Sequence, residues 1–146
     1  MEVVTKRFNQ LALGELYQIL QLRSEVFVVE QDCVYQDIDG KDEQALHVIG
    51  YIDNQIIGYA RCFSPGFYFE EAAIGRVVIR QGFRDRNFGH KLFSAAVEAV
   101  ANEFKVGNIR ISAQLHLTKF YEKHQFQSVG SSYLEDGIPH INMLRR

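Results

Sequence analysis

The sequence contains no tryptophan, only two prolines and only two cysteines among its 146 residues. The two cysteines, Cys33 and Cys62, are too few for a dense disulfide framework and match no metal-binding spacing, so we expect reduced thiols. No apolar run approaches the roughly 20 residues that cross a bilayer, and the N-terminus lacks the basic and then apolar pattern of a secretory signal. These absences favour a cytoplasmic protein without a membrane partner.

An excess of either charge is also missing. The formal net charge is −2, so no overall basic field favours a nucleic-acid partner. The five histidines form no HxxxH or HxH pair with a supporting carboxylate, and the acidic stretch "DIDGKDE" lacks the spacing of an EF-hand, so we expect no metal. What is present, 47% hydrophobic and 23% charged residues, is typical of one globular domain spanning residues 1–146.

Apolar periodicity predicts an ordered series of elements. They are a strand over 3–8, a helix over 13 to about 28, strands over 45–52, 55–63 and 72–79, a helix over 87–104, a strand over 108–113, a short helix over 117–124, and two closing strands around "EDGIP". The first helix carries a stripe formed by Leu16, Leu20, Arg23 and Phe27. Asp53 and Asn54 predict a tight hairpin, and Gly107 is placed to end the second helix. This order implies an α/β (α+β) fold, a mixed central sheet covered by helices.

The stretch "VVIRQGFRDRNFGHKLF" (77–93) crowds basic residues and glycines between a strand and a helix. A Walker A loop fails on spacing, because six residues separate Gly82 from Gly89 and His90 intervenes before Lys91. A Rossmann fingerprint fails as well, since no GxGxxG occurs and "NIRISAQ" ends without a carboxylate. A solvated basic loop remains one alternative, and an anion-binding cradle at a helix N-terminus is the other.

Within this stretch, "RDRNFG" resembles the R/Q-x-x-G-x-G/A signature of the GCN5-related N-acetyltransferase (GNAT) superfamily. Arg84 matches the first motif position and Gly89 the last, while Asn87 replaces the middle glycine and tolerates left-handed backbone. The resemblance implies that the backbone wraps the pyrophosphate of acetyl-coenzyme A. The residues so implied in binding the donor are Val77, Val78, Ile79, Arg84, Asp85, Arg86, Asn87, Phe88, Gly89, His90, Gln114 and Tyr121.

A second landmark lies downstream, in "AQLHLTKFYEKHQF". It resembles the family pattern A-x-x-F/L-Y-x-x-x-G-F, with Gln125 where glycine is common, and the family's tyrosine falls on Tyr121. Further segments resemble the ElaA-like branch over about residues 15–143, including "LRSEVFVVEQDCVYQDIDGKD", "LHVIG", "IGRVVI" and "EDGIPHINM". The fold so implied is the GNAT sandwich, whose central strands splay apart to admit the pantetheine arm.

The resemblance implies an acetyl-CoA-dependent N-acetyltransferase that works by direct transfer in a ternary complex. A phenol such as that of Tyr121 stays protonated at neutral pH and can donate its proton to the departing thiolate. Backbone N–H groups from Val77 to Ile79 would stabilise the oxyanion. Neither motif region contains a cysteine, which disfavours a covalent acyl-enzyme.

An alkylamine is mostly protonated at pH 7, so a base must deprotonate it. Glu71 and Glu30 are the leading candidates, ahead of Glu70 and His140. For each glutamate an ordinary solvated charge is the alternative, and for Glu30 that alternative includes an internal salt bridge with Arg23.

The acceptor pocket is expected to include Arg23, Glu30, Asp39 and His140. The acidic loop that contains Asp39 favours, as a hypothesis, a cationic acceptor such as a polyamine, an aminoalkyl group or a lysine, in a small molecule or a peptide. A merely solvated loop is the alternative.

Two competing functions remain open. One is a GNAT-fold domain that binds acyl-CoA as a sensor or partner module without turnover, and the other is an interaction domain whose basic loop docks on RNA, which the charge balance disfavours. Exposed strands at the C-terminus indicate a possible homodimer.

Overall fold

The computed structural model describes all residues from 1 to 146. The strands are β1 (Glu2–Arg7), β2 (Leu46–Ile52), β3 (Gln55–Phe63), β4 (Ala72–Ile79), β5 (Ile109–Gln114), β6 (Gln127–Glu135) and β7 (Ile138–Arg145). The helices are α1 (Leu13–Arg23), continued by a π-helical segment (Ser24–Glu30), α2 (Phe88–Phe104) and α3 (Thr118–Glu122). The predicted order of strands and helices is confirmed.

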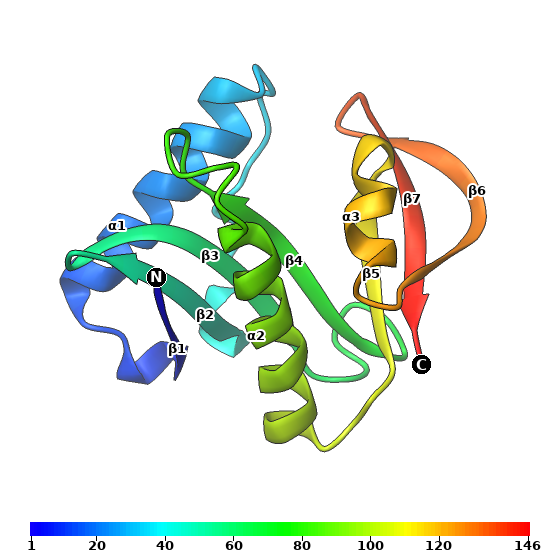
Figure 1. Cartoon of the computed structure of the whole chain (residues 1–146), viewed down its shortest axis with the longest axis horizontal. Helices are drawn as coiled ribbons and strands as arrows, with labels where there is room; N and C mark the ends of the chain where they lie inside the picture. The colour runs from blue at the N-terminus through cyan, green and yellow to red at the C-terminus, as the bar shows by residue number, and fades with distance from the viewer.

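The seven strands form one mixed sheet in the order β1-β2-β3-β4-β5-β7-β6. All neighbours are antiparallel except β4 and β5, which are parallel and pair only at Ala72 with Ile109 and at Ala73 with Arg110. Beyond these two pairs the strands diverge, as Figure 1 shows. The α/β class and the splayed central strands are therefore both confirmed.

Side-chain alternation along the strands gives the sheet two apolar faces. One cluster joins Ile19 and Leu22 of α1 to Ile49 of β2. The larger cluster joins Leu92 and other residues of α2 to the neighbouring Val48. The two long helices thus cover opposite faces of the sheet (Figure 1), and neither is long and apolar enough to span a membrane.

Two local predictions about the helices need correction. The most deeply buried positions of α1 include Ile19 and Leu22, whereas the predicted Leu16 and Leu20 are only half-buried. The second helix ends at Phe104, because Lys105 takes the left-handed conformation that ends a helix. Gly107 therefore has no part in that helix end.

The predicted hairpin is confirmed. Asp53 and Asn54 connect β2 to β3 with φ angles of 50° and 63°. Two successive left-handed residues match the right-handed twist of the flanking strands. The hairpin brings β3, and with it Arg61, to the centre of the sheet.

Candidate active site

A bulge in β4 aims one arginine into a cavity. The register of β4 against β3 shifts between Tyr59 and Arg61, and Arg76 is left-handed with φ of 50°. A bulge adds a residue to one strand and re-aims its side chain, and the Arg76 side chain lines the cavity. Because β4 has no β5 partner beyond Ala73, this edge of the strand is open to a ligand.

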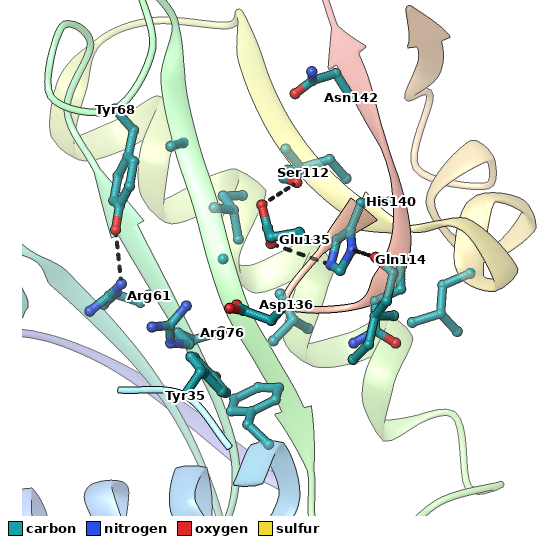
Figure 2. A pocket seen from close by; sticks show the side chains of 18 of the residues that line it. Tyr35, Arg61, Tyr68, Arg76, Ser112, Gln114, Glu135, Asp136, His140 and Asn142 are labelled. Carbon is teal, nitrogen blue, oxygen red and sulfur yellow. Dashed lines mark hydrogen bonds and ion pairs between the residues drawn. The ribbon is translucent and has the colours of Figure 1, made fainter. Parts of the chain in front are cut away.

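The cavity has a volume of about 560 Å³ and lies where β4 and β5 separate. Five of the residues predicted for the site line it: Asp39, Val77, Gln114, Tyr121 and His140. Figure 2 also shows wall residues that sequence reasoning missed, among them Arg61, Arg76, Ser112, Glu135 and Asp136. Arg76, Glu135 and Asp136 lie in the segments "IGRVVI" and "EDGIPHINM", but no local signal assigned any of the five to the site, because they come from segments far apart in the sequence.

Tyr121 occupies the α3 wall of this cavity. Its ring packs edge-on against Phe93 and Phe120, with centroid separations of 5.0 and 5.1 Å. The side chain is 8% exposed, and burial raises the pKa of the phenol to about 12. Because of this raised pKa the phenol stays protonated at neutral pH. No protein group bonds to its hydroxyl, so the hydroxyl can donate to a ligand in the cavity.

The loop between β4 and α2 presents unpaired backbone donors. The N–H groups of residues 84–87 donate to no acceptor in the protein, and the first turn of α2 adds N–H groups that helix geometry leaves free. Gly82, Asp85 and Asn87 are all left-handed, with φ of 94°, 65° and 61°, and this conformation curves the loop. The expected tolerance of Asn87 for left-handed backbone is confirmed. Curved backbone with free N–H groups at a helix N-terminus fits a diphosphate.

The side chains at the start of α2 face away from this loop. His90 bonds to His124 through Nδ1 and Nε2 at 2.9 Å and stacks on Phe120. A Cβ added at Gly89 would lie 3.4 Å from the Phe120 ring, in van der Waals contact with it. These positions can therefore serve a ligand through their backbone.

Arg84 and Glu30 fasten the loop to the first helical segment. The Arg84 guanidinium donates to the Ile79 carbonyl at 2.9 Å and to both Glu30 oxygens, at 2.6 and 3.0 Å. Glu30 lies outside the cavity wall. The structure thus pairs Glu30 with Arg84, and the alternative salt bridge between Glu30 and Arg23 does not form.

Arg23 is fully buried and does not line the cavity. Its guanidinium bonds to Asp37 at 3.0 Å and to Asp42 at 2.7 Å. Arg23 has no exposed surface, and its bonds to the two aspartates anchor the acidic loop to α1. Its geometry offers no contact with an acceptor.

Asp39 reaches the cavity but is already paired. Arg61 donates to both of its oxygens at 2.8 Å. Burial by itself would raise the pKa of Asp39, but the hydrogen bonds from Arg61 outweigh it and hold the pKa well below its usual range. The Asp39 charge is therefore neutralised within the protein.

His140 faces Glu135 across the β6–β7 hairpin. His140 Nδ1 lies 2.7 Å from the Ile138 carbonyl, which can only accept, so Nδ1 carries a proton and Nε2 is the ring nitrogen that can act as an acceptor. Nε2 lies 3.4 Å from the Glu135 carboxylate, which in turn accepts from Ser112 at 3.2 Å. His140, Glu135 and Ser112 thus form one chain of polar contacts on the cavity wall.

Glu71 and Glu70 lie at a separate, shallow surface site together with Pro65 and Gly107. Glu71 pairs with Arg110 at 3.0 Å, and the hydrogen bonds from Arg110 lower its pKa. A carboxylate with a lowered pKa is a weaker base. The structure does not bring either glutamate to the cavity that contains Tyr121.

A cysteine also reaches the cavity, which the sequence did not indicate. Cys33 is 9% exposed and lines the wall, where its Sγ lies 3.5 Å from the Asp136 carbonyl. It follows the first helical segment and lies in neither motif.

The family can now be assigned. A family model described as an acetyltransferase (GNAT) domain matches residues 10–146. The chain belongs to this GNAT family. Protein ElaA of Escherichia coli K12 is 39% identical over 139 residues, which cover 94% of this chain and 91% of ElaA, so the chain is an ElaA-like GNAT protein.

Solved structures agree with this assignment. The crystal structure of Escherichia coli ElaA matches with a TM-score of 0.93 at 37% sequence identity. The crystal structure of an acyl-CoA N-acyltransferase from Pseudomonas aeruginosa matches with a TM-score of 0.94 at 39% sequence identity. Each comparison covers 99% of both chains. An aminoglycoside 6'-N-acetyltransferase complexed with coenzyme A shares the fold, with a TM-score of 0.72 at 14% identity over 97% of this chain and 95% of that one. Membership of the GNAT family supports an acyltransferase as the class of enzyme.

Proposed function

We propose that this GNAT protein transfers an acetyl group from acetyl-CoA to a primary amine by direct attack within a ternary complex. The observation that carries the proposal is Tyr121, which lines the cavity at the splay of β4 and β5 and whose hydroxyl has no hydrogen-bond partner in the protein. The unpaired N–H groups of residues 84–87 support a CoA-based donor. The Pseudomonas aeruginosa acyl-CoA N-acyltransferase and the CoA-bound aminoglycoside acetyltransferase lend further support.

In the proposed reaction the amine nitrogen attacks the thioester carbonyl carbon, so that a C–N bond forms and the C–S bond breaks. The open edge of β4 around Val77 would hold the carbonyl oxygen through backbone N–H groups. Tyr121 would give its proton to the sulfur as the thiolate departs. The phenol would then recover a proton from solvent.

For the base we propose His140. With Nδ1 held by the Ile138 carbonyl, Nε2 is the ring nitrogen that can accept a proton, and His140 lies on the cavity wall. Glu135, 3.4 Å away, would stabilise the imidazolium once the amine proton has moved to Nε2. Glu30 and Glu71 are both paired with arginines outside the cavity, and this favours His140 over them.

Three measurements test the proposal. Calorimetric titration with acetyl-CoA is expected to give heat of binding, and bound acetyl-CoA is expected to raise the Tm of the protein. A screen of an amine library with acetyl-CoA is expected to release the free thiol of CoA. Tyr121→Phe is expected to lower kcat by about 10²-fold or more while the Kd for CoA stays within threefold. Phe126→Leu, which changes a buried aromatic residue outside the cavity wall, controls for loss of packing.

Each failure has a distinct meaning. Acetyl-CoA binding without thiol release from any amine would identify a domain that binds acyl-CoA without turnover. Absence of both heat and stabilisation would refute the CoA site itself. Unchanged kcat in Tyr121→Phe would remove Tyr121 from the chemistry.

A further inference from the structure

We infer that the acceptor amine carries a carboxylate, so that the substrate is a zwitterion of the amino-acid type. This inference rests on the proposed function, because it concerns the acceptor side of the same cavity. It follows from two walls of opposite character, one formed by Arg76 and its partners and the other by the β6–β7 turn.

Arg76 supplies the cationic wall. Its Nε donates to Asp37 Oδ1 at 2.7 Å and its Nη2 to the Asp37 carbonyl at 3.2 Å, while Nη1 donates to no acceptor in the protein. The side chain is 22% exposed and lines the cavity. One edge of the guanidinium is therefore fixed by the protein and the other is available to an acceptor oxygen of a ligand.

The charges behind Arg76 are balanced. Three arginines and three aspartates form one connected cluster: Arg23, Arg61, Arg76, Asp37, Asp39 and Asp42. Each of the three aspartates is thus paired with at least one arginine. These three aspartates, which supported the hypothesis of a cationic acceptor, are therefore already neutralised by arginines, and the cluster holds Arg76 in position.

The opposite wall is anionic. Glu135 and Asp136 line the cavity without a lysine or arginine partner, and only His140 lies within ion-pair distance of Glu135. Figure 2 shows these residues on the β6–β7 hairpin across from Arg76. An ammonium group entering the cavity is attracted to this wall, where His140 Nε2 can remove its proton.

The two walls together select the substrate class. An amine at His140 would place a carboxylate of the same molecule at the free Nη1 of Arg76. A polyamine would instead bring a second ammonium group to the guanidinium, which is repulsive. Aromatic residues also line the cavity, including Tyr35, Phe63 and Phe69, and provide apolar surface for the carbon skeleton of such an amino acid.

The decisive experiment compares matched acceptors with acetyl-CoA, read by thiol release. The series contains phenylalanine, lysine and ω-amino acids from glycine to 6-aminohexanoate, each beside its carboxamide and its decarboxylated amine. We expect at least one acid to exceed both counterparts about tenfold or more in kcat/KM, as expected of one charge-assisted hydrogen bond. If every carboxamide or decarboxylated amine reacts as well as its acid, the inference is overturned while acetyl transfer to amines stands.

Variants locate the preference within the cavity. Arg76→Gln should lower kcat/KM for the acid about tenfold and leave the decarboxylated amine nearly unchanged, whereas Arg76→Lys should retain part of the preference. Arg7→Gln removes an arginine from an exposed ion pair with Glu103 and is the matched control. The comparison of acceptors uses the native protein, so it tests the inference of a carboxylate-bearing acceptor even if Arg76→Gln unfolds. Failure of every amine to release thiol would overturn the inference and the proposed function together.

Discussion

The Glu30 carboxylate accepts two hydrogen bonds from the Arg84 guanidinium, at 2.6 and 3.0 Å, across 54 positions of sequence. The contact joins the end of the first helical segment to the loop that presents free N–H groups. Both side chains are partly exposed, so the pair contributes at most about 1 kcal/mol to the free energy of unfolding. Its main effect is on the position of the loop.

Removing Arg84 should therefore affect donor binding more than folding. Arg84→Gln loses the bond to the Ile79 carbonyl as well as the ion pair, and we expect the Kd for CoA to rise about tenfold. Glu30→Gln keeps the bond to Ile79 and should leave kcat within threefold. Glu103→Gln, from the exposed pair with Arg7, is the control. A fall of 100-fold in kcat for Glu30→Gln alone would instead identify Glu30 as the base.

The base can be assigned by comparing two variants. His140→Gln should lower kcat by about 10²-fold or more, because it removes the free Nε2 acceptor in the cavity. Glu71→Gln should change kcat by less than threefold, because Arg110 holds that carboxylate away from the cavity. Steady-state kinetics at saturating acetyl-CoA measure both, and the reverse pattern would restore Glu71 as the base.

Gln125 stands where the family often has glycine, and its φ is 65°. A left-handed residue with a Cβ is strained by roughly 1–2 kcal/mol, partly offset by the greater entropy that glycine loses on folding. Gln125→Gly should therefore raise the free energy of unfolding by about 0.5–1 kcal/mol, measured by urea denaturation. Glu98→Gly, at an exposed position inside α2, should lower it by about 1 kcal/mol. A loss of stability in Gln125→Gly would contradict this assignment of strain.

Acid sensitivity should arise partly at Glu15. Burial by itself would raise the pKa of Glu15, but hydrogen bonds from Lys6, Tyr51 and the Ala12 N–H outweigh it and lower the pKa to about 2. The folded-state pKa lies below the unfolded value of 4.5, so the stabilisation is present above that value and is lost as the pH falls toward 2.

Chemical denaturation between pH 6 and pH 2 measures this effect. We expect Glu15→Gln to be less stable at pH 6 and to lose less stability on acidification than the native protein. Glu122→Gln, at an exposed residue without an ion pair, is the matched control. Parallel pH profiles for the native protein and Glu15→Gln would show that Glu15 does not carry the effect.

Several features were accessible from the sequence because they depend on a few neighbouring residues. The turn at Asp53 and Asn54 and the left-handed Asn87 follow from the backbone preferences of asparagine and aspartate. The place of Tyr121 on a short helix follows from the apolar spacing of residues 117–124. On the first helical segment the predicted stripe was half right. Arg23 and Phe27 are buried, but Ile19 and Leu22 are buried in place of Leu16 and Leu20, because tertiary packing decides which side of a partly apolar helix faces the sheet.

The sequence by itself determined the order of the elements, the loop before α2 and the tyrosine on α3, since each is encoded by local pattern and backbone preference. The tertiary structure alone decided how the charges pair. Arg76 meets Asp37 across 39 positions, Arg84 meets Glu30 across 54, and Glu71 is held by Arg110 across 39. A charged side chain carries no local sign of its partner, because that partner is fixed by strand register and by the bulge in β4. The tertiary structure thereby leaves Arg76 Nη1 without a partner and places His140 beside Glu135 on the cavity wall.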